Sequence, residues 1–254
     1  MLNMKKLTLL SFFCFMAILA QGQSKMDKIT LGVQTGLTFS WMKSNDNKIN
    51  SNGVPLGFRI GLHAEYALNE KFSLCSGLHM AIAQGGHLKH DVGGNFFPNS
   101  KLSSPTLNNG DKPLPDGVDI KYKLQIFEVP FSLKMRTRDF GYISYFAELP
   151  IFTLGLVSKA RGSFNGDNVK AENENINGDV VALNLGLGAG LGVKYALTTE
   201  TAIYLGVYYH SIFTDMTEDE GFKAIEKVGG GYDQVSENSK GTMGQISIKV
   251  GVNF

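Results

Sequence analysis

Apolar and polar residues alternate one by one along the last stretch of the chain, residues 241–254. From position 246 onward the apolar set is Ile246, Ile248, Val250, Val252 and Phe254, and polar or small residues fill the positions between. Successive side chains of a β-strand point to opposite faces. This stretch therefore predicts a strand with one apolar face and one polar face.

Seven further segments show the same period of two, at 29–41, 54–68, 72–84, 120–136, 142–157, 180–195 and 201–214. Long polar connections at 42–53, 85–119, 158–179 and 215–240 alternate with short turns. An even number of strands, with long connections at one end and short turns at the other, is the pattern of outer-membrane barrels. The sequence predicts an all-β fold, an eight-stranded antiparallel transmembrane β-barrel in up-and-down order. We expect both termini in the periplasm and the long loops outside the cell.

The segment 120–136 changes its apolar face half-way. Ile120, Tyr122, Leu124 and Ile126 form one set, and Phe127, Val129, Phe131, Leu133 and Met135 form the next. A shift of one residue is what a β-bulge produces, so we expect a bulge near Phe127. Pro130 follows it and cannot donate to the ladder.

The front of the chain predicts a signal peptide. Lys5 and Lys6 precede an uncharged apolar run, 7–20, which is shorter than the ~20 residues of a spanning helix. We expect residues 1–20 to be removed, with cleavage as late as 22, and 21–254 to form one barrel domain. The alternative is a membrane anchor helix. The mature chain then holds 22 basic and 23 acidic residues, which gives no electrostatic case for nucleic acid. Cys75 is its one cysteine, so no intrachain disulfide is expected.

Alternation alone does not say which face points outward. A secreted lipocalin-like barrel also has eight alternating strands, with the apolar face inside around a ligand. Here the polar face of segment 29–41 carries no charge, whereas a water-facing surface is about a quarter to a third charged. Small uncharged residues suit a crowded lumen, so the pattern favours an outer-membrane location with lipid as the outer partner.

The octamer FEVPFSLK at 127–134 and the final strand resemble those of PorT-like outer-membrane barrels of Bacteroidetes-type bacteria. The resemblance implies an eight-stranded barrel. Some relatives are tied to protein secretion, so it also implies secretion or envelope-assembly proteins as partners, but it carries no activity. We expect the barrel assembly machinery to read the terminal strand through Val250, Val252 and Phe254.

Charged residues occupy many of the positions expected to face the lumen. They are Arg59, His63, Glu65, Glu128, Lys134, Arg136, Glu148, Lys194, His210 and Lys249. An unpaired buried charge is costly, so we expect these groups to pair across the lumen as a structural network. A proton path or a small-ion site is the alternative interpretation. Eight strands enclose only enough room for side chains, which disfavours a small-solute porin.

Other clusters suggest chemistry without specifying it. His87, His90 and Asp91 lie in a stretch expected to be a solvated loop, and a flexible loop does not fix a metal geometry. The acidic run around Asp215 lacks the spacing of a calcium-binding loop. We therefore expect no cofactor and no metal.

Two pairs on this chain could be imagined at a catalytic site. His210 beside Ser211, or His87 with Asp91, would serve an outer-rim enzyme acting on lipid or peptide. Nothing in the spacing brings them within reach. The expected function is non-enzymatic, with the long loops, chiefly 85–119, making contacts to partners.

Overall fold

The computed structural model describes residues 28–104, 107, 114–228 and 230–254. The expected signal peptide lies outside this range. The strands are β1 (Ile29–Ser44), β2 (Ile49–Ser51), β3 (Leu56–Ala67), β4 (Phe72–His90), β5 (Gly94–Asn95), β6 (Val118–Arg136), β7 (Ile143–Gly166), β8 (Val169–Asn175), β9 (Leu183–Ala196), β10 (Ala202–Ile212), β11 (Phe222–Glu226), β12 (Tyr232–Ser236) and β13 (Gly241–Asn253). A short 3₁₀ helix, η1, spans Asn177–Asp179. No helix in the described ranges is long and apolar enough to cross a membrane.

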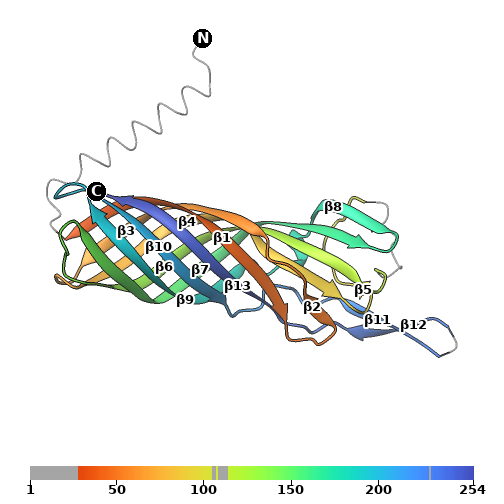
Figure 1. Cartoon of the computed structure of the whole chain (residues 1–254). Helices are drawn as coiled ribbons and strands as arrows, with labels where there is room; N and C mark the ends of the chain where they lie inside the picture. The colour runs from red at the N-terminus through yellow and green to blue at the C-terminus, as the bar shows by residue number, and fades with distance from the viewer. Residues whose placement is uncertain (1–27, 105–106, 108–113, 229) are drawn as a thin grey trace, which may run out of the picture.

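Eight long strands of the described chain close a ring. Strand β1 pairs with β13 on one side and with β3 on the other, and the order continues through β4, β6, β7, β9 and β10 back to β13. Every pairing is antiparallel. The predicted all-β, eight-stranded, up-and-down barrel is therefore confirmed. The C-terminus lies at one end of the ring, and β5, β8, β11 and β12 lie beyond the other (Figure 1).

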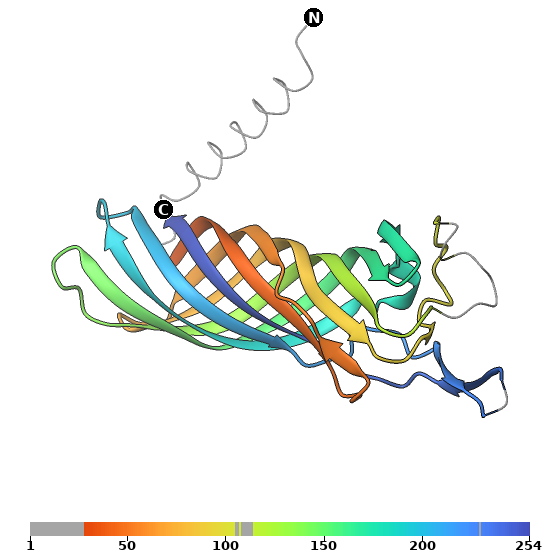
Figure 2. The same ribbon diagram turned by 45° about the vertical axis from the view of Figure 1, so that its right-hand side comes forward.

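The long connections are not the irregular polar loops that the sequence predicted. Strand β4 continues to His90, β6 begins at Val118, β7 continues to Gly166 and then pairs with β8. Strands β12, β11 and β5 form a separate small sheet. We call this part the cap. It comprises β2, β5, β8, β11 and β12 with their described connections, together with residues 85–90 of β4, 118–125 of β6 and 159–166 of β7. The cap continues the barrel at the end away from the C-terminus (Figure 2).

Around the barrel the large apolar side chains point outward. Examples are Leu62, Leu78, Phe131, Phe152, Leu191 and Val207, which are between 45% and 67% exposed. Polar side chains point inward, among them Arg59, His79, Glu128, Lys134, Ser247 and Lys249, which are no more than 6% exposed. We call the outward apolar surface the belt. This distribution is the reverse of a water-soluble barrel.

The cap reverses the distribution again, and β6 shows the change within one strand. Its odd-numbered residues point outward throughout, Lys121 and Lys123 in the cap and Phe127 in the belt. Its even-numbered residues point inward, from buried Tyr122 in the cap to buried Glu128 in the barrel. The predicted bulge in this strand is therefore wrong. The apolar set changes face because the surroundings change, with β6 itself keeping its phase.

At this level two bulges lie instead on the two neighbours of β6. Between Ala81 and Gln84 the register of β4 against β6 shifts by one residue, and Ala83 there has φ 58°. On β7 the register shifts beside Gln125 of β6, where Ser158 is the extra residue. Both bulges flank β6 where belt gives way to cap. Bulges bend and twist a strand, so they mark the boundary between the two parts.

The cap has an apolar core of its own. The buried cluster is Met42, Ile49, Ala81, Leu88, Phe96, Phe97, Val118, Ile120, Tyr122, Leu124, Ile126, Ala160, Phe164, Val169, Ala171, Ile176, Val180, Ile212, Met216 and Met243. Several members come from the ends of ring strands, so the core also fills the barrel mouth. Phe97 makes an edge-on contact with Phe164, with ring centroids 5.2 Å apart. Phe96 and Phe97, in the stretch 85–119 that was expected to be a free loop, are thus packed in this core.

Candidate functional site

The polar residues of the lumen gather around Arg59. From β3 its Nη2 donates to Glu128 Oε1 on β6 at 2.8 Å and to Gln245 Oε1 on β13 at 3.2 Å. Its Nη1 donates to Ser247 Oγ at 3.1 Å. One guanidinium therefore joins three strands, and the side chains of Arg59 and Glu128 are 2% and 4% exposed. Several bonds to one planar cation are what a buried pair needs to offset its desolvation.

A second ion pair lies nearer the C-terminal end. Lys134 Nζ donates to Glu65 Oε2 at 2.8 Å. The same ammonium lies 4.6 Å from the ring centroid of Phe146 and 5.6 Å from that of Tyr204. Its charge is therefore held by a carboxylate and two aromatic faces.

Neutral side chains link the charged groups. Tyr204 Oη donates to Gln34 Oε1 at 2.7 Å, and Gln34 Nε2 lies 2.5 Å from His79 Nε2. Tyr204 Oη also lies 3.4 Å from His63 Nδ1. We did not predict Gln34 or Tyr204 from the sequence, because only charged inward positions were considered. Their signal was available, since both occupy lumen-facing positions of alternating strands.

Glu148 on β7 belongs to a third polar cluster, which Lys249 of β13 joins through the ring of Tyr208. Its Oε1 accepts from Ser132 Oγ at 2.6 Å and its Oε2 from Tyr208 Oη at 3.4 Å. Lys249 Nζ lies 4.0 Å from the centroid of the Tyr208 ring, and the His210 ring lies nearly parallel to that ring with centroids 6.5 Å apart. The glycine opposite Tyr208 on β9, Gly190, leaves the space this ring occupies, because a Cβ there would overlap it.

The predicted lumen set is therefore brought together in large part. Lys194 and Arg136 stand apart, partly exposed toward the C-terminal end, where Arg136 Nε donates to the carbonyl of Glu70 at 2.6 Å. The cavity among Glu148, Lys134 and Tyr208 has a volume of about 30 Å³. That is room for one or two waters. Side chains, and the cap core above them, fill the lumen.

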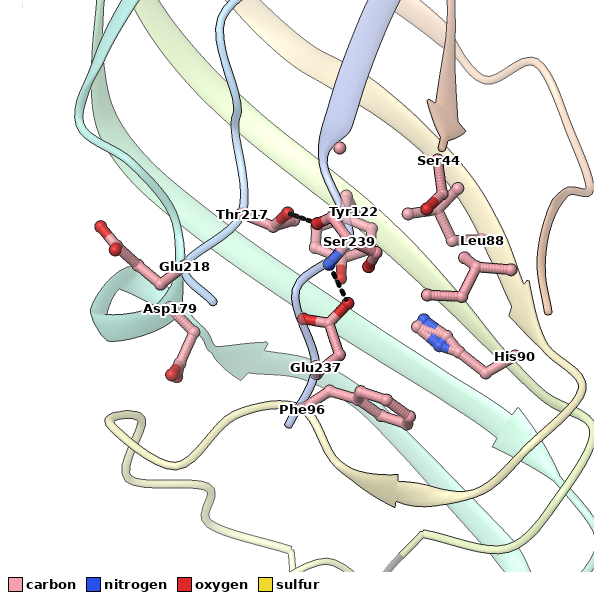
Figure 3. A pocket seen from close by; sticks show the side chains of 12 residues that line it. Ser44, Leu88, His90, Phe96, Tyr122, Asp179, Thr217, Glu218, Glu237 and Ser239 are labelled. Carbon is pink, nitrogen blue, oxygen red and sulfur yellow. Dashed lines mark hydrogen bonds between the residues drawn. The ribbon is translucent and has the colours of Figure 1, made fainter. Parts of the chain in front are cut away.

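A second small pocket lies inside the cap (Figure 3). Its volume is about 20 Å³, and its wall includes His90, Tyr122, Asp179, Glu218 and Glu237. Both ring nitrogens of His90 are buried without a hydrogen-bond partner in the described structure. His90 is thus an interior residue, and its expected place in a solvated loop is wrong. The sequence predicts that this strand ends at residue 84, whereas β4 continues to His90.

Burial shifts the ionisation of the cap carboxylates. It raises the pKa of Glu237 to about 7, although a hydrogen bond from the Ser239 backbone opposes the shift. Burial likewise raises the pKa of Asp179, which accepts a hydrogen bond from the Asn99 backbone at 3.0 Å. The described residues contain no group of three or more acidic, histidine or cysteine side chains placed to hold a metal ion.

Neither of the two candidate catalytic pairs, His87 with Asp91 and His210 with Ser211, has the arrangement that catalysis would need. His87 Nδ1 lies 3.2 Å from Asp119 Oδ2, while Asp91 accepts from Asn50 Nδ2 at 2.8 Å. His210 points into the lumen and is 4% exposed, and the adjacent Ser211 on the same strand points outward. Neither imagined pair is formed.

No family model and no curated protein matches the sequence. Among solved structures, Neisserial surface protein A is 16% identical with a TM-score of 0.38, covering 88% of this chain and 97% of that one. Ail of Yersinia pestis, in complex with a heparin analogue, is 11% identical with a TM-score of 0.37, covering 89% and 99%. A major outer membrane protein from Thermus thermophilus is 14% identical with a TM-score of 0.40, covering 89% and 99%. Identities and TM-scores this low do not support any assignment, and the fold is assigned from the closed ring of eight strands.

The terminal strand is fully paired in the ring. Val250 and Val252 face outward on β13, and Phe254 exchanges backbone hydrogen bonds with Leu31 of β1 at 2.9 and 3.2 Å. Their expected role as an assembly signal stays a prediction. No family match supports the resemblance to PorT-like barrels.

Proposed function

We propose that the protein is an integral outer-membrane β-barrel that carries a folded cap on the cell surface and acts through contacts of that cap. The belt supports the membrane location. A water-soluble protein rarely exposes a contiguous apolar surface of more than a few hundred Å², and here the apolar face surrounds the ring. With the C-terminus in the periplasm, the cap lies outside the cell.

The lumen supports a role other than solute passage. The Arg59 and Lys134 clusters fill the barrel, and the cap core closes the mouth. Purified protein in a planar lipid bilayer should show no large, steady conductance. A stable channel that passes small sugars would contradict this part of the proposal and favour the porin alternative.

One observation supports a contact role for the cap. The β11–β12 hairpin projects from the cap and carries exposed apolar side chains at Ile225, Val228, Tyr232 and Val235. These lie beyond the belt, so lipid does not cover them. Strand β12 is the edge of its sheet and pairs with β11. An exposed apolar strand edge is a surface that protein partners use, which fits envelope or secretion proteins as partners.

The test separates location from contact. Fractionation should place the protein in the outer membrane, and recovery in the soluble periplasm would contradict the proposal. A variant with Ile225→Ser, Tyr232→Ser and Val235→Ser should reach the outer membrane at normal levels. It should fail to complement a strain that lacks the gene. A control with Leu183→Ser, Leu185→Ser and Leu187→Ser alters the belt and should lower membrane levels instead. Full complementation by the hairpin variant would place the function elsewhere.

The enzymatic alternative has weaker support. His87 and Asp119 form the one new pair among the positions considered, and no serine or cysteine nucleophile is bonded to it in the described structure. Substitution of His87 by Gln should therefore leave complementation unchanged.

A further inference from the structure

Four basic side chains lie side by side on the outer surface where the cap meets the belt. They are Lys121 and Lys123 on β6 and Lys159 and Arg161 on β7, and we call them the basic patch. In the register of the two strands Lys123 is directly opposite Arg161, and Lys159 is opposite Gln125. The three lysines are exposed and Arg161 is partly exposed.

The arrangement is unfavourable for the isolated protein. Like charges directly opposite on an antiparallel pair destabilise it, yet Lys123 and Arg161 occupy such positions. No ion pair of the described structure includes any of the four residues. The nearby carboxylates bind other partners. Asp119 pairs with His87, and Glu174 points inward and accepts a hydrogen bond from the Ser103 backbone.

A further carboxylate lies on β8. Glu172 is exposed near Ser163, one strand away from Lys121, and it forms no ion pair in the described ranges. The Arg161 guanidinium is fixed from the same side, since its Nη1 donates to the carbonyl of Asn173 at 3.3 Å. Its Nε is buried without a partner. The patch is therefore a positioned positive surface.

The height of the patch points to its ligand. On these two strands the last outward-facing pair of the belt is Phe127 with Leu156. The next outward-facing pair toward the cap is Gln125 with Lys159. Same-face rows are ~6.7 Å apart along a strand, so with a tilt of ~45° each row rises by ~5 Å. Lys159 then lies about 5 Å above the belt, and Lys123 with Arg161 about 10 Å. Lipid headgroups occupy the first ~5–8 Å beyond the hydrocarbon core. The backbone of Lys159 lies at that level, and Lys123 and Arg161 lie just above it, within reach of headgroups through their long side chains.

The patch gathers four basic side chains on two neighbouring strands, whereas β1 carries a single exposed lysine, Lys43, at its cap end. On the other side, Trp41 of β1 and Tyr209 of β10 lie with ring centroids 6.4 Å apart, and aromatic residues are typical of membrane interfaces. Uniform attraction to a membrane surface would place basic residues all round. A localised cluster over an apolar face is suited to one lipid, with its chains against the belt and its headgroup against the charges.

We propose that the basic patch binds the phosphate-bearing headgroup of an anionic lipid in the outer leaflet. This inference rests on the proposed outer-membrane location. The lipid's phosphate sits between Lys123 and Arg161, relieving their mutual repulsion, and Lys121 and Lys159 contact further anionic oxygens. Arg161 supplies a fork of donors and the lysines supply mobile point charges. Outward-facing Phe127, Leu154 and Leu156 accept the acyl chains.

The test measures lipid binding to the whole mature barrel in a neutral detergent. Native mass spectrometry should show retention of phosphatidic acid, a phosphate-monoester lipid, over phosphatidylcholine with the same chains. The variant Lys121→Gln, Lys123→Gln, Lys159→Gln, Arg161→Gln should lose the preference, with affinity falling about fivefold for each charge removed. The control Lys43→Gln, Lys48→Gln, Lys101→Gln, Lys240→Gln removes the same charge at exposed sites elsewhere and should keep it.

The other outcomes are equally decisive. If the fourfold variant does not assemble, Lys123→Gln with Lys159→Gln carries the test, with a loss of about 25-fold expected. Equal loss in the control would show a net-charge effect and overturn the proposal. Equal binding of inorganic phosphate, or displacement of lipid by it at millimolar concentration, would show a free-phosphate site and also overturn it. A protein that reaches the outer membrane without lipid preference contradicts this inference alone, whereas one recovered from the soluble periplasm contradicts the location on which it rests.

Discussion

Arg59 is a single residue that links three strands across the lumen. It reaches from β3 to Glu128 and to the last strand, and it is 2% exposed. Removing one partner of such a pair leaves a charge in a site that water does not reach. That cost exceeds the net contribution of the intact pair, because the attraction within the pair is already offset by the desolvation of both groups.

We therefore expect Glu128→Gln to lower the free energy of unfolding by about 3–5 kcal/mol. Urea unfolding of the folded barrel in detergent, followed by the shift in gel mobility of unheated samples, measures it. Asp233→Asn is the control, since Asp233 pairs with Lys227 at side chains that are 62% and 50% exposed, and its effect should stay below about 1 kcal/mol. Equal effects of the two changes would show that Arg59 does not depend on Glu128.

Glu237 makes the cap sensitive to pH. Burial raises the pKa of this carboxyl from its ordinary 4.5 to about 7. Between those values the folded cap keeps a proton that the unfolded cap releases. The associated stability is full below pH 4.5 and is lost as the pH rises to about 7. The same sign holds for Asp179, whose pKa burial also raises.

Amide protection factors in the cap should accordingly be lower at about pH 8 than at about pH 5.5, while those of the barrel change little. Glu237→Gln carries a neutral side chain at every pH and should reduce this difference. Asp167→Asn, at an exposed turn, is the control and should leave it intact. A wild-type cap whose protection rises with pH across this range would contradict the expected direction.

At the scale of elements, the ring strands were predictable and the cap was not. The period of two located all eight ring strands, because each has a continuous belt face. In the cap the apolar residues point inward and the strands are short, so β5, β8, β11 and β12 give little periodic signal. The change of face at Ile126 and Phe127 did carry information. It was interpreted as a bulge, whereas it marks the level at which the lumen becomes an apolar core.

The residues of the lumen site were predictable from the sequence, but their pairing was not. Alternation assigned Arg59, Glu128 and Lys134 to the interior, and opposite charges had to pair there. Which acid meets which base depends on strand register and side-chain reach, and a single sequence does not specify these. His90 was missed for the reason that the cap was missed: its strand was predicted to end before it.

The cap and the barrel should separate as structural elements. Residues 91–117 connect His90 and Val118, which are paired neighbours on β4 and β6. Replacing them with a short turn should leave the ring assembled, while cap amides lose protection because Phe96 and Phe97 leave the core. Replacing only 228–230, at the tip of the β11–β12 hairpin, should preserve that protection. Failure of the first variant to assemble would show that the ring depends on the cap.

At the scale of the molecule, two environments meet along a single continuous sheet. The barrel has apolar side chains outside and polar ones inside, whereas the cap has an apolar core and, apart from the β11–β12 hairpin, a mainly polar surface. Lipid explains the first arrangement and water the second. The central claim is therefore that the belt lies in a membrane and the cap lies in water, with the boundary between Phe127 and Gln125 on β6.

A spin-label scan along β6 tests this claim most directly. Single cysteines at 121, 123, 127 and 131, in a protein with Cys75→Ser, are labelled and reconstituted in lipid bilayers. Labels at 127 and 131 should be relaxed by oxygen, which concentrates in hydrocarbon, and labels at 121 and 123 by a water-soluble nickel complex. A label at 129, also outward, should behave like 127. Preferential relaxation at 127 and 131 by the nickel complex would place the belt in water and contradict the claim.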